Sequence, residues 1–533
     1  MLEKALFPEQ VGVDSDVVTS HIKYLESIGM RMDSYVVLRH GKVACECHWT
    51  PIDAKVPHDM FSLSKSIVST AIGIAYDEGI IDLNTKIYPK YFQHKLNQMK
   101  DKQREWAEKM TIHDVISMRA GVVTPIIDDK EKNTDWLQAF LDSKITFEPG
   151  TDFKYISENA FLLSWIIQKE TGLNLTEYLT PRLYEPMGIK VPFWEKNQQD
   201  VNAGGWGLML TAEDLCKLAI LYLNKGEYNG KRIFSEEWYN LATTPYTEKT
   251  YPVFTDKSEY GYQIWIDHEN DDTTYRFTGL YGQFIFMFPD YDAAVVITAS
   301  DNRDDESIHS LYAHYPKAFI EAKEECNSEK LNTFNKYLDS RRISPDFKNA
   351  SPRRNIPMEK KINNRMIKLV SPQNLSVLGA VNYFMWRKKI GKLNDLKFNF
   401  SADGLEFSFK EKNCGRTVIK AGMKGEYIRN VVRLAETDVV IDAQATWNND
   451  GSLELFICPS GRPQRRRLTF VFNGNTVKVS SKTDPGYGDL AKFNIEFNFA
   501  FKVGEKIQSV IDTCAPIFES VYSDPNAYGW FMK

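Results

Sequence analysis

The sequence predicts an α/β (α+β) fold with two domains: a first domain of helices and one sheet, and a separate, mostly-β C-terminal domain. Strand patterns occur at 34–45 and return between 260 and 298, whereas residues from about 82 to 241 show helical patterns with polar, Pro and Gly breaks. Beyond residue 365, apolar and polar residues alternate between Asn, Asp and Gly turns. Strands at both ends of the first domain, with helices between them, favour a single sheet assembled from those two ends.

The chain of 533 residues is too long for one ordinary domain. We predict a first domain over 1–326 and a β-rich domain over 365–533. Between them, 327–364 is polar, contains prolines and is rich in Lys and Arg, which is typical of a linker. The strands expected in the β-rich domain include 396–409, 439–447, 453–458, 468–472 and 493–501.

The β-rich domain carries no motif that assigns it a role. A lid over a cleft, a dimer contact and a carbohydrate-binding module are all open. Its aromatic residues are interpreted as core rather than as a sugar-binding platform, among them Tyr383, Phe384 and Trp386.

The composition is that of a globular protein, with 43% hydrophobic and 26% charged residues. A formal net charge of −5 argues against nucleic acid as a partner. An arginine cluster is interpreted as a solvated strand end or turn: Arg462, Arg465, Arg466 and Arg467. No apolar run approaches the length of a membrane span. The N-terminus shows no signal-peptide pattern, so the chain as given is expected to be cytoplasmic, or extracytoplasmic if a signal was removed.

The seven cysteines are dispersed, which is typical of a reducing compartment. Cys45 and Cys47, beside His48, occupy alternate positions of an expected strand and have no second pair of ligands. We therefore interpret them as buried thiols and predict no metal site. The sequence specifies no oligomeric state.

The chemistry centres on Ser62 and Lys65, which lie three residues apart at the start of an apolar helical run that should end at Gly79. On a helix the two side chains share one face of the first turn. A buried lysine amine can accept the serine proton, which activates an otherwise weak nucleophile. The unpaired N–H of Ser62 itself can face a developing oxyanion. On these residues alone a helix-capping serine is the favoured interpretation, because Ser-x-x-Lys is common by chance.

Four further stretches follow this motif in order, at 153–159, 204–215, 221–231 and 277–283. Together with 61–67 the set resembles the serine β-lactamase-like family, which includes class C β-lactamases, D-Ala-D-Ala carboxypeptidases, related esterases and 6-aminohexanoate-oligomer hydrolases. The resemblance covers about residues 10 to 320 and excludes the β-rich domain. It implies an antiparallel sheet flanked by helices, with an all-helical subdomain, as in the β-lactamase and transpeptidase fold.

The resemblance also implies roles for individual residues. Ser62 matches the acylated nucleophile, Lys65 its proton-accepting partner, and Tyr155 the tyrosine of the family's Tyr-x-Asn motif, whose third position is Ser157 here. The backbone N–H groups of Ser62 and Leu280 match the oxyanion hole. The expected substrate-binding residues are Ser157, Phe277, Thr278, Gly279 and Tyr281. No cofactor or metal is implied, and either a neutral Lys65 or a Tyr155 phenolate can serve as base.

The chain departs from the family pattern at two positions. Penicillin-recognising members have Lys or His where this chain has Phe277, and Asn where it has Ser157. The neighbouring Arg276 should point to the opposite face of its strand. Gly204, Gly205 and Gly207 are assigned to tight turns and close packing, with no chemistry.

These departures favour a small, weakly charged ester, amide or peptide-like substrate. The leading hypothesis is a serine hydrolase that acts through an acyl-serine intermediate. The alternatives are a β-lactamase or D-amino-acid peptidase (carboxypeptidase), and a binding or sensor protein that is acylated without turnover.

Overall fold

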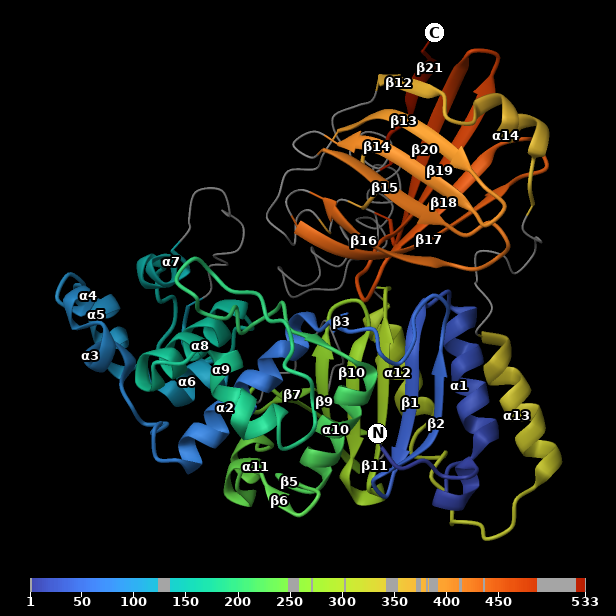
Figure 1. Cartoon of the computed structure of the whole chain (residues 1–533). Helices are drawn as coiled ribbons and strands as arrows, with labels where there is room; N and C mark the ends of the chain where they lie inside the picture. The colour runs from blue at the N-terminus through green and yellow to red at the C-terminus, as the bar shows by residue number, and fades with distance from the viewer. Residues whose placement is uncertain are drawn as a thin grey trace, which may run out of the picture.

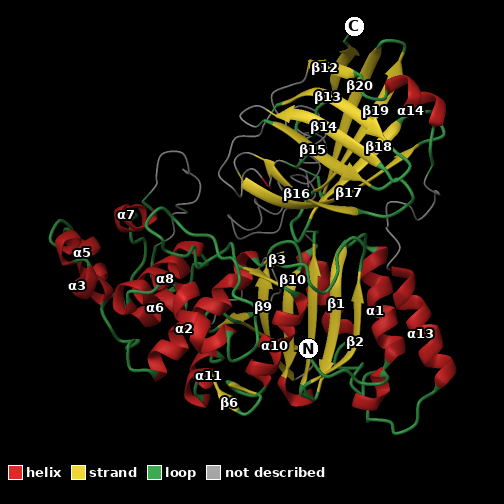
Figure 2. Cartoon of the chain, in the orientation of Figure 1, coloured by secondary structure: helices red, strands yellow, loops and turns green. Residues whose placement is uncertain are grey.

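The computed structural model describes residues 2–122, 135–247, 258–269, 272–301, 303–341, 353–370, 375–379, 382, 392–411, 415–434, 437–486 and 524–532. They form a mixed helix and sheet domain and a separate β domain (Figures 1 and 2). This arrangement confirms the predicted fold class. The strand predicted at 493–501, and the aromatic residues Tyr383, Phe384 and Trp386, lie outside the described residues.

The sheet of the first domain is built from both of its ends, as predicted. Its strand order is β2-β1-β11-β10-β9-β8-β7, and every neighbouring pair is antiparallel. The strands are β1 (Met32–Arg39), β2 (Lys42–His48), β7 (Glu259–Tyr260), β8 (Trp265–Glu269), β9 (Asp272–Gly279), β10 (Gln283–Phe288) and β11 (Ala293–Ala299). The early β1 pairs with the late β11, which closes the domain on itself.

Side chains alternate across this sheet and build one core on each face. Val36 and Val296 face a cluster that includes α2 (Ser64–Asp77) and α10 (Ala212–Leu223). Tyr35 and Val295 face the opposite cluster, which includes α1 (Ser15–Ser27) and α12 (Asp304–His314). Helices therefore cover both faces (Figure 2).

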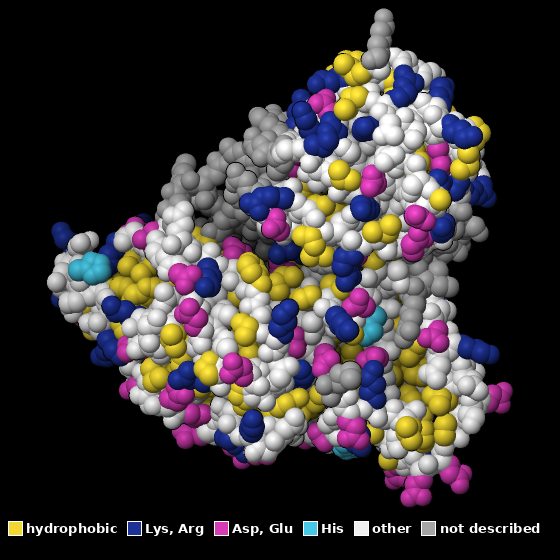
Figure 3. All heavy atoms as spheres, in the orientation of Figure 1, with side chains coloured by type: hydrophobic (Ala, Val, Ile, Leu, Met, Phe, Trp, Pro, Cys, Tyr) yellow, Lys and Arg dark blue, Asp and Glu magenta, His cyan; other side chains and the backbone are white. Residues whose placement is uncertain are grey.

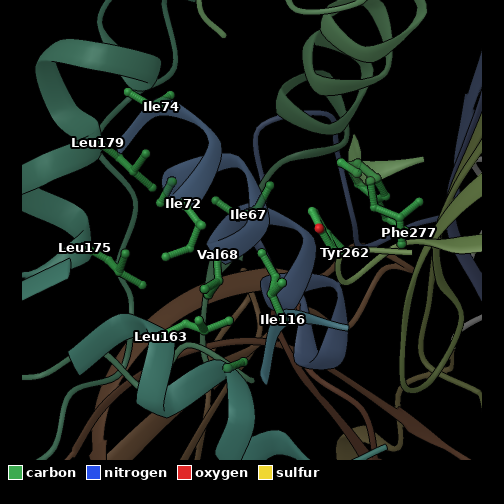
Figure 4. Close-up of a cluster of buried hydrophobic side chains, with 14 of the residues drawn as sticks. Ile67, Val68, Ile72, Ile74, Ile116, Leu163, Leu175, Leu179, Tyr262 and Phe277 are labelled. Carbon is green, nitrogen blue, oxygen red and sulfur yellow. The ribbon is translucent and has the colours of Figure 1, made fainter. Parts of the chain in front are cut away.

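Helix α2 is buried on almost every side, as its apolar sequence predicts. Its residues Ile67, Val68 and Ile72 lie among side chains of several other helices, including Leu163 and Leu175 (Figure 4). These neighbours belong to the helical subdomain, which comprises α3 (Ile87–Tyr91), α4 (Gln93–Leu96), α5 (Asp101–Lys109), α6 (Ile112–Ile116), α7 (Trp136–Asp142), α8 (Ser157–Thr171) and α9 (Leu175–Leu179). The site therefore begins on a helix that the rest of the domain holds rigidly.

The structure places a packed helix where the sequence suggests a linker. Residues Ser328–Arg341 form α13, and α14 (Ile356–Ile362) follows within the same stretch. Phe334 of α13 is buried in the cluster that contains α1, and Lys330 makes ion pairs with Glu9 and Asp14. The helix has a narrow apolar stripe and a wide polar face, which explains why its composition suggests a linker.

The described strands of the β domain form one barrel-like sheet, in the order β15-β14-β13-β12-β21-β20-β19-β18-β17-β16. The two end strands are β15 (Arg416–Ala421) and β16 (Ile428–Leu434), and they lie side by side. The side-chain amide of Asn430 on β16 accepts a hydrogen bond from the backbone N–H of Lys420 on β15 and donates one to its carbonyl oxygen. The other strands are β12 (Met366–Val370), β13 (Leu393–Phe400), β14 (Leu405–Glu411), β17 (Thr437–Trp447), β18 (Leu453–Pro459), β19 (Arg465–Asn473), β20 (Thr476–Asp484) and β21 (Ala527–Phe531). We call this unit the barrel domain.

Acidic and basic side chains are intermingled on the visible face of the molecule (Figure 3). Within the described parts of the chain, every helix falls short of the length and apolarity that crossing a bilayer requires. Cys45 and Cys47 are buried on β2, as predicted.

Candidate active site

Ser62 and Lys65 meet at the start of α2. Ser62 lies in a short 3-10 turn, Phe61–Leu63, that leads directly into the helix. Lys65 Nζ lies 2.8 Å from Ser62 Oγ. No side-chain capping hydrogen bond is made at the start of either helical segment, so Ser62 is not the cap that the isolated motif favours. Its half-buried hydroxyl is instead turned toward the amine.

Two further oxygens surround the Lys65 amine. Nζ lies 3.0 Å from Ser157 Oγ, at the first position of α8, and 2.9 Å from the carbonyl oxygen of Gly205. A neutral amine has two N–H groups and one lone pair. If the N–H groups point to Ser157 and Gly205, the lone pair faces the Ser62 hydroxyl and can accept its proton.

Burial determines the protonation of Lys65, whose side chain is 1% exposed. Desolvation lowers the pKa of Lys65 to about 7, and the negative charge of Glu158 opposes this shift. A substantial fraction of the amine is therefore neutral near neutral pH. A lysine at its ordinary pKa would remain charged and could not act as a base.

The ring of Tyr155 forms another wall of this site. Lys65 Nζ lies 4.9 Å from the ring centre, and Tyr155 is 5% exposed. The ring stacks on Trp265 of β8 at 5.6 Å and meets Tyr260 of β7 edge-on at 5.9 Å. The sheet thus fixes the tyrosine beside the amine.

Strand β9 approaches the nucleophile turn very closely. A Cβ atom added to Gly279 would lie 2.1 Å from the carbonyl oxygen of Met60, so only glycine fits at this position. Leu280, the next residue, is partly exposed and leaves the end of the strand beside the Ser62 turn. The strand end and the Ser62 turn therefore lie in direct contact.

Thr278 is held by a cation from its own strand. Arg276 donates to Thr278 Oγ1 at 2.9 Å, and its guanidinium also pairs with Asp267 at 2.6 Å. All three side chains are buried. Because the threonine oxygen accepts from Arg276, its own O–H is directed away from the guanidinium.

Two residues that the sequence predicts to bind substrate are buried in the structure. Phe277 lies in the core of the domain (Figure 4). Its side chain is fully buried and its ring meets Tyr222 edge-on at 4.8 Å, so it offers no surface to a substrate. Tyr281 is 6% exposed and packs on Phe61 at 5.1 Å. It therefore supports the turn that carries Ser62 rather than lining an open cleft.

Comparisons with known proteins identify the family of the first domain. The Beta-lactamase family model matches residues 23–314, or 292 of the 533 residues. The chain belongs to the beta-lactamase family. Among the relatives, the 6-aminohexanoate-dimer hydrolase of Paenarthrobacter ureafaciens is 25% identical over 289 residues, which cover 50% of this chain and 72% of that protein. Protein flp of Staphylococcus aureus (strain MW2) is 25% identical over 171 residues, which cover 30% of this chain and 33% of that protein.

Two solved structures are also similar to this chain. The octameric penicillin-binding protein homologue from Pyrococcus abyssi has a TM-score of 0.47 and 15% identity, with coverage of 87% of this chain and 97% of its own. The penicillin binding protein from Bacillus halodurans has a TM-score of 0.43 and 15% identity, with coverage of 55% of this chain and 99% of its own.

Two contacts at this site were not predicted from the sequence. The carbonyl of Gly205 contacts Lys65, and a Cβ atom on Gly205 would lie 2.8 Å from the carbonyl oxygen of Ser157. The glycine permits this approach, but backbone oxygens leave no signal in a sequence. The bond from Arg276 to Thr278 does have a signal, because residues two apart on a strand share a face.

Proposed function

We propose that this chain is a metal-independent serine hydrolase that opens an ester or amide bond through an acyl-Ser62 intermediate. The observation that carries the proposal is the 2.8 Å contact between Ser62 Oγ and a buried Lys65 amine whose pKa is lowered to about 7. The hydrolase relative in the same family gives independent support. Ser62, Lys65 and Tyr155 are the proposed catalytic residues.

In the acylation step, Lys65 Nζ takes the proton of the Ser62 hydroxyl while Oγ attacks the carbonyl carbon of the substrate. The oxyanion that forms accepts hydrogen bonds from the backbone N–H groups of Ser62 and Leu280. The intermediate then expels the alcohol or amine, which leaves with the proton held at Lys65, passed directly or through the Tyr155 hydroxyl. The acyl group stays on Ser62.

In the deacylation step, water attacks the acyl carbonyl and gives its proton to the same neutral amine. Collapse of the second oxyanion returns that proton to Ser62 Oγ and releases the acid. The site is thereby restored, and no external oxidant, reductant or cofactor enters the balance.

The lining of the site favours a weakly charged substrate. The position that carries a cation in penicillin-recognising members holds the buried Phe277, and Arg276 at the preceding position is already paired with Asp267. A substrate carboxylate would therefore find less positive charge here than in those members. Thr278, Ser157 and the backbone of Gly279 are the proposed polar contacts for the substrate.

The test is intact-protein mass after incubation with a fluorophosphonate, followed by turnover of short-chain esters, amides and a chromogenic cephalosporin. We expect one adduct on the wild type and on Ser27→Ala, which removes an exposed serine at the end of α1, and none on Ser62→Ala. Tyr155→Phe should label slowly. A folded wild type without an adduct would contradict the proposal.

The turnover arm separates the remaining alternatives. Steady ester or amide hydrolysis supports the proposed enzyme. Release of one leaving group per chain, with no further product, would identify a slowly deacylating sensor, and preference for the cephalosporin would identify a β-lactamase.

A further inference from the structure

One turn of the barrel domain lies against the segment that precedes Ser62. This turn joins β18 to β19 and contains Gly461 and Arg462. The backbone N–H of Asp59 donates to the carbonyl oxygen of Gly461 at 2.9 Å, and Arg462 donates to Asp59 Oδ2 at 3.2 Å. Asp59 is 3% exposed, so this contact between the domains is buried on the side of the first domain.

The glycine of this turn is required by the contact. Gly461 has φ +65°, and a Cβ atom there would lie 1.9 Å from the carbonyl oxygen of Pro57. A side chain would therefore clash with the backbone of the first domain as well as strain the turn. The close approach indicates a built interface rather than a loose touch.

A second arginine holds the turn from its other end. Arg465 donates to Asp33 Oδ1 at 2.8 Å, and both side chains are buried. The second carboxylate oxygen of Asp33 accepts from Ser300 and faces His58 at 3.5 Å. Burial raises the pKa of Asp33, but the hydrogen bond with His58 and the charge of Arg465 outweigh it and lower the pKa. The arginine cluster is thus partly an interface, not the solvated turn that the sequence suggests.

Asp59 transmits this contact to the nucleophile turn. Its Oδ1 accepts the backbone N–H of Phe61 at 3.2 Å, while its Oδ2 binds Arg462. Phe61 has φ +45°, a conformation that an L side chain rarely adopts without support. Ser62 follows directly, so the carboxylate links the barrel domain to the residue that sets the direction of the nucleophile.

We infer that Arg462 is a positioning residue for Ser62, acting through Asp59, and that the barrel domain is a working part of the acyl-transfer site. This inference rests on the proposed hydrolase function. The role it gives the barrel domain differs from those of a moving lid and of a carbohydrate-binding module. The turn acts as a fixed brace on the segment that carries the nucleophile.

The charge of Arg462 is what makes the brace effective. Burial raises the pKa of Asp59 above its ordinary value, and the charge of Arg462 and the Phe61 N–H offset only part of that rise. Without the arginine, a buried carboxylate would lose its nearest cation and would move toward water or take up a proton. Either change weakens its hold on Phe61.

The experiment measures the second-order rate of fluorophosphonate addition to Ser62, and kcat and KM on the best ester, for two matched pairs. Arg462→Met is compared with Arg467→Met, which changes an arginine of β19 that lies over Phe456 within the barrel. Gly461→Ala is compared with Gly474→Ala, a glycine with φ +59° whose added Cβ would meet nothing within 4 Å. Thermal unfolding of each variant checks that it is folded.

We expect Arg462→Met and Gly461→Ala to label at least tenfold more slowly, with kcat reduced and KM little changed, whereas both controls stay within twofold of the wild type. Arg462→Lys should regain most of the rate, because it restores the cation. Asp59→Asn combined with Arg462→Met should lose less than the product of the two single losses, since no buried charge remains.

Three results would overturn the inference. Labelling of Arg462→Met and Gly461→Ala within twofold of the wild type would show that the brace is not needed. An equal loss in the control variants would assign the effect to general damage of the barrel. A wild type that forms no adduct would instead refute the proposed function itself, and the inference with it.

Discussion

Lys65 Nζ lies 4.9 Å from the ring centre of Tyr155 while it contacts Ser62 Oγ at 2.8 Å. The face of an aromatic ring favours a cation, whereas burial disfavours one. Desolvation prevails and lowers the pKa of Lys65 to about 7. The amine is therefore able to change its charge during a reaction cycle at neutral pH, which is the property a proton shuttle needs.

The rate of acylation should depend on the charge of Lys65. Because the neutral amine is the base, the rate should rise as pH increases through about 7 and then level off. Fluorophosphonate labelling of the wild type between pH 5 and 9 measures this directly. Lys65→Arg, which stays protonated, should be inactive throughout, and a flat wild-type profile would exclude Lys65 as the titrating group.

Glu158 should set the position of that pH profile. Its negative charge raises the pKa of Lys65, so Glu158→Gln should shift the midpoint of the labelling profile to lower pH. Glu170→Gln, near the other end of α8, is the control and should leave the midpoint in place. A shift to higher pH in Glu158→Gln would show that this carboxylate acts in another way.

Gly279→Ala should separate β9 from the nucleophile turn. The new Cβ would lie 2.1 Å from the Met60 carbonyl oxygen, so the strand or the turn must move. We expect a loss of stability of about 1–3 kcal/mol and near-complete loss of labelling. Gly415→Ala, where an added Cβ meets nothing within 4 Å, is the matched control. Denaturant unfolding and adduct mass together test this, and normal labelling of Gly279→Ala would count against the proposed oxyanion hole.

Helix α13 should stabilise the first domain although it follows the predicted domain boundary. Phe334 is 4% exposed and packs in the core that contains α1, so Phe334→Ala should cost about 3 kcal/mol of unfolding free energy. Phe193→Ala, which truncates a side chain that is 63% exposed, should change stability by less than about 0.5 kcal/mol. Equal unfolding curves for the two variants would mean that α13 is not part of the cooperative unit.

The sequence was most informative where a feature is local. The single sheet built from both ends of the first domain, the buried helix after Ser62 and the separate β domain follow from periodicity and turn residues, and the structure agrees with them. The polar surface of α13 suggested a linker, because one buried phenylalanine is a weak signal among charged residues. Contacts between distant segments were not predictable, since nothing in the arginine cluster indicates that Arg465 reaches Asp33.

In the candidate site, too, local features were predictable from the sequence and contacts between distant residues were not. The spacing of Ser62 and Lys65 placed both side chains correctly on one turn, and Arg276 does point away from Phe277. The burial of Phe277 depends on Tyr222, which is distant in sequence, and so it could not be anticipated. The carbonyl oxygen of Gly205 contacts Lys65, but it is a backbone atom that every residue type carries, so the sequence gives no sign of this contact.

The anchoring of α13 has a consequence for how firmly the two domains stay together. Arg341 at the end of this helix is paired with Glu26 of α1, so the covalent connection to the barrel domain departs from a fixed point. Contact between Gly461 and Asp59 is then an intramolecular event, with an effective concentration that short tethers bring to roughly the millimolar range. An interface whose dissociation constant lies well below that concentration therefore stays closed. If a protease cut the chain after Arg341, the same contact would become bimolecular, and activity would fall on dilution.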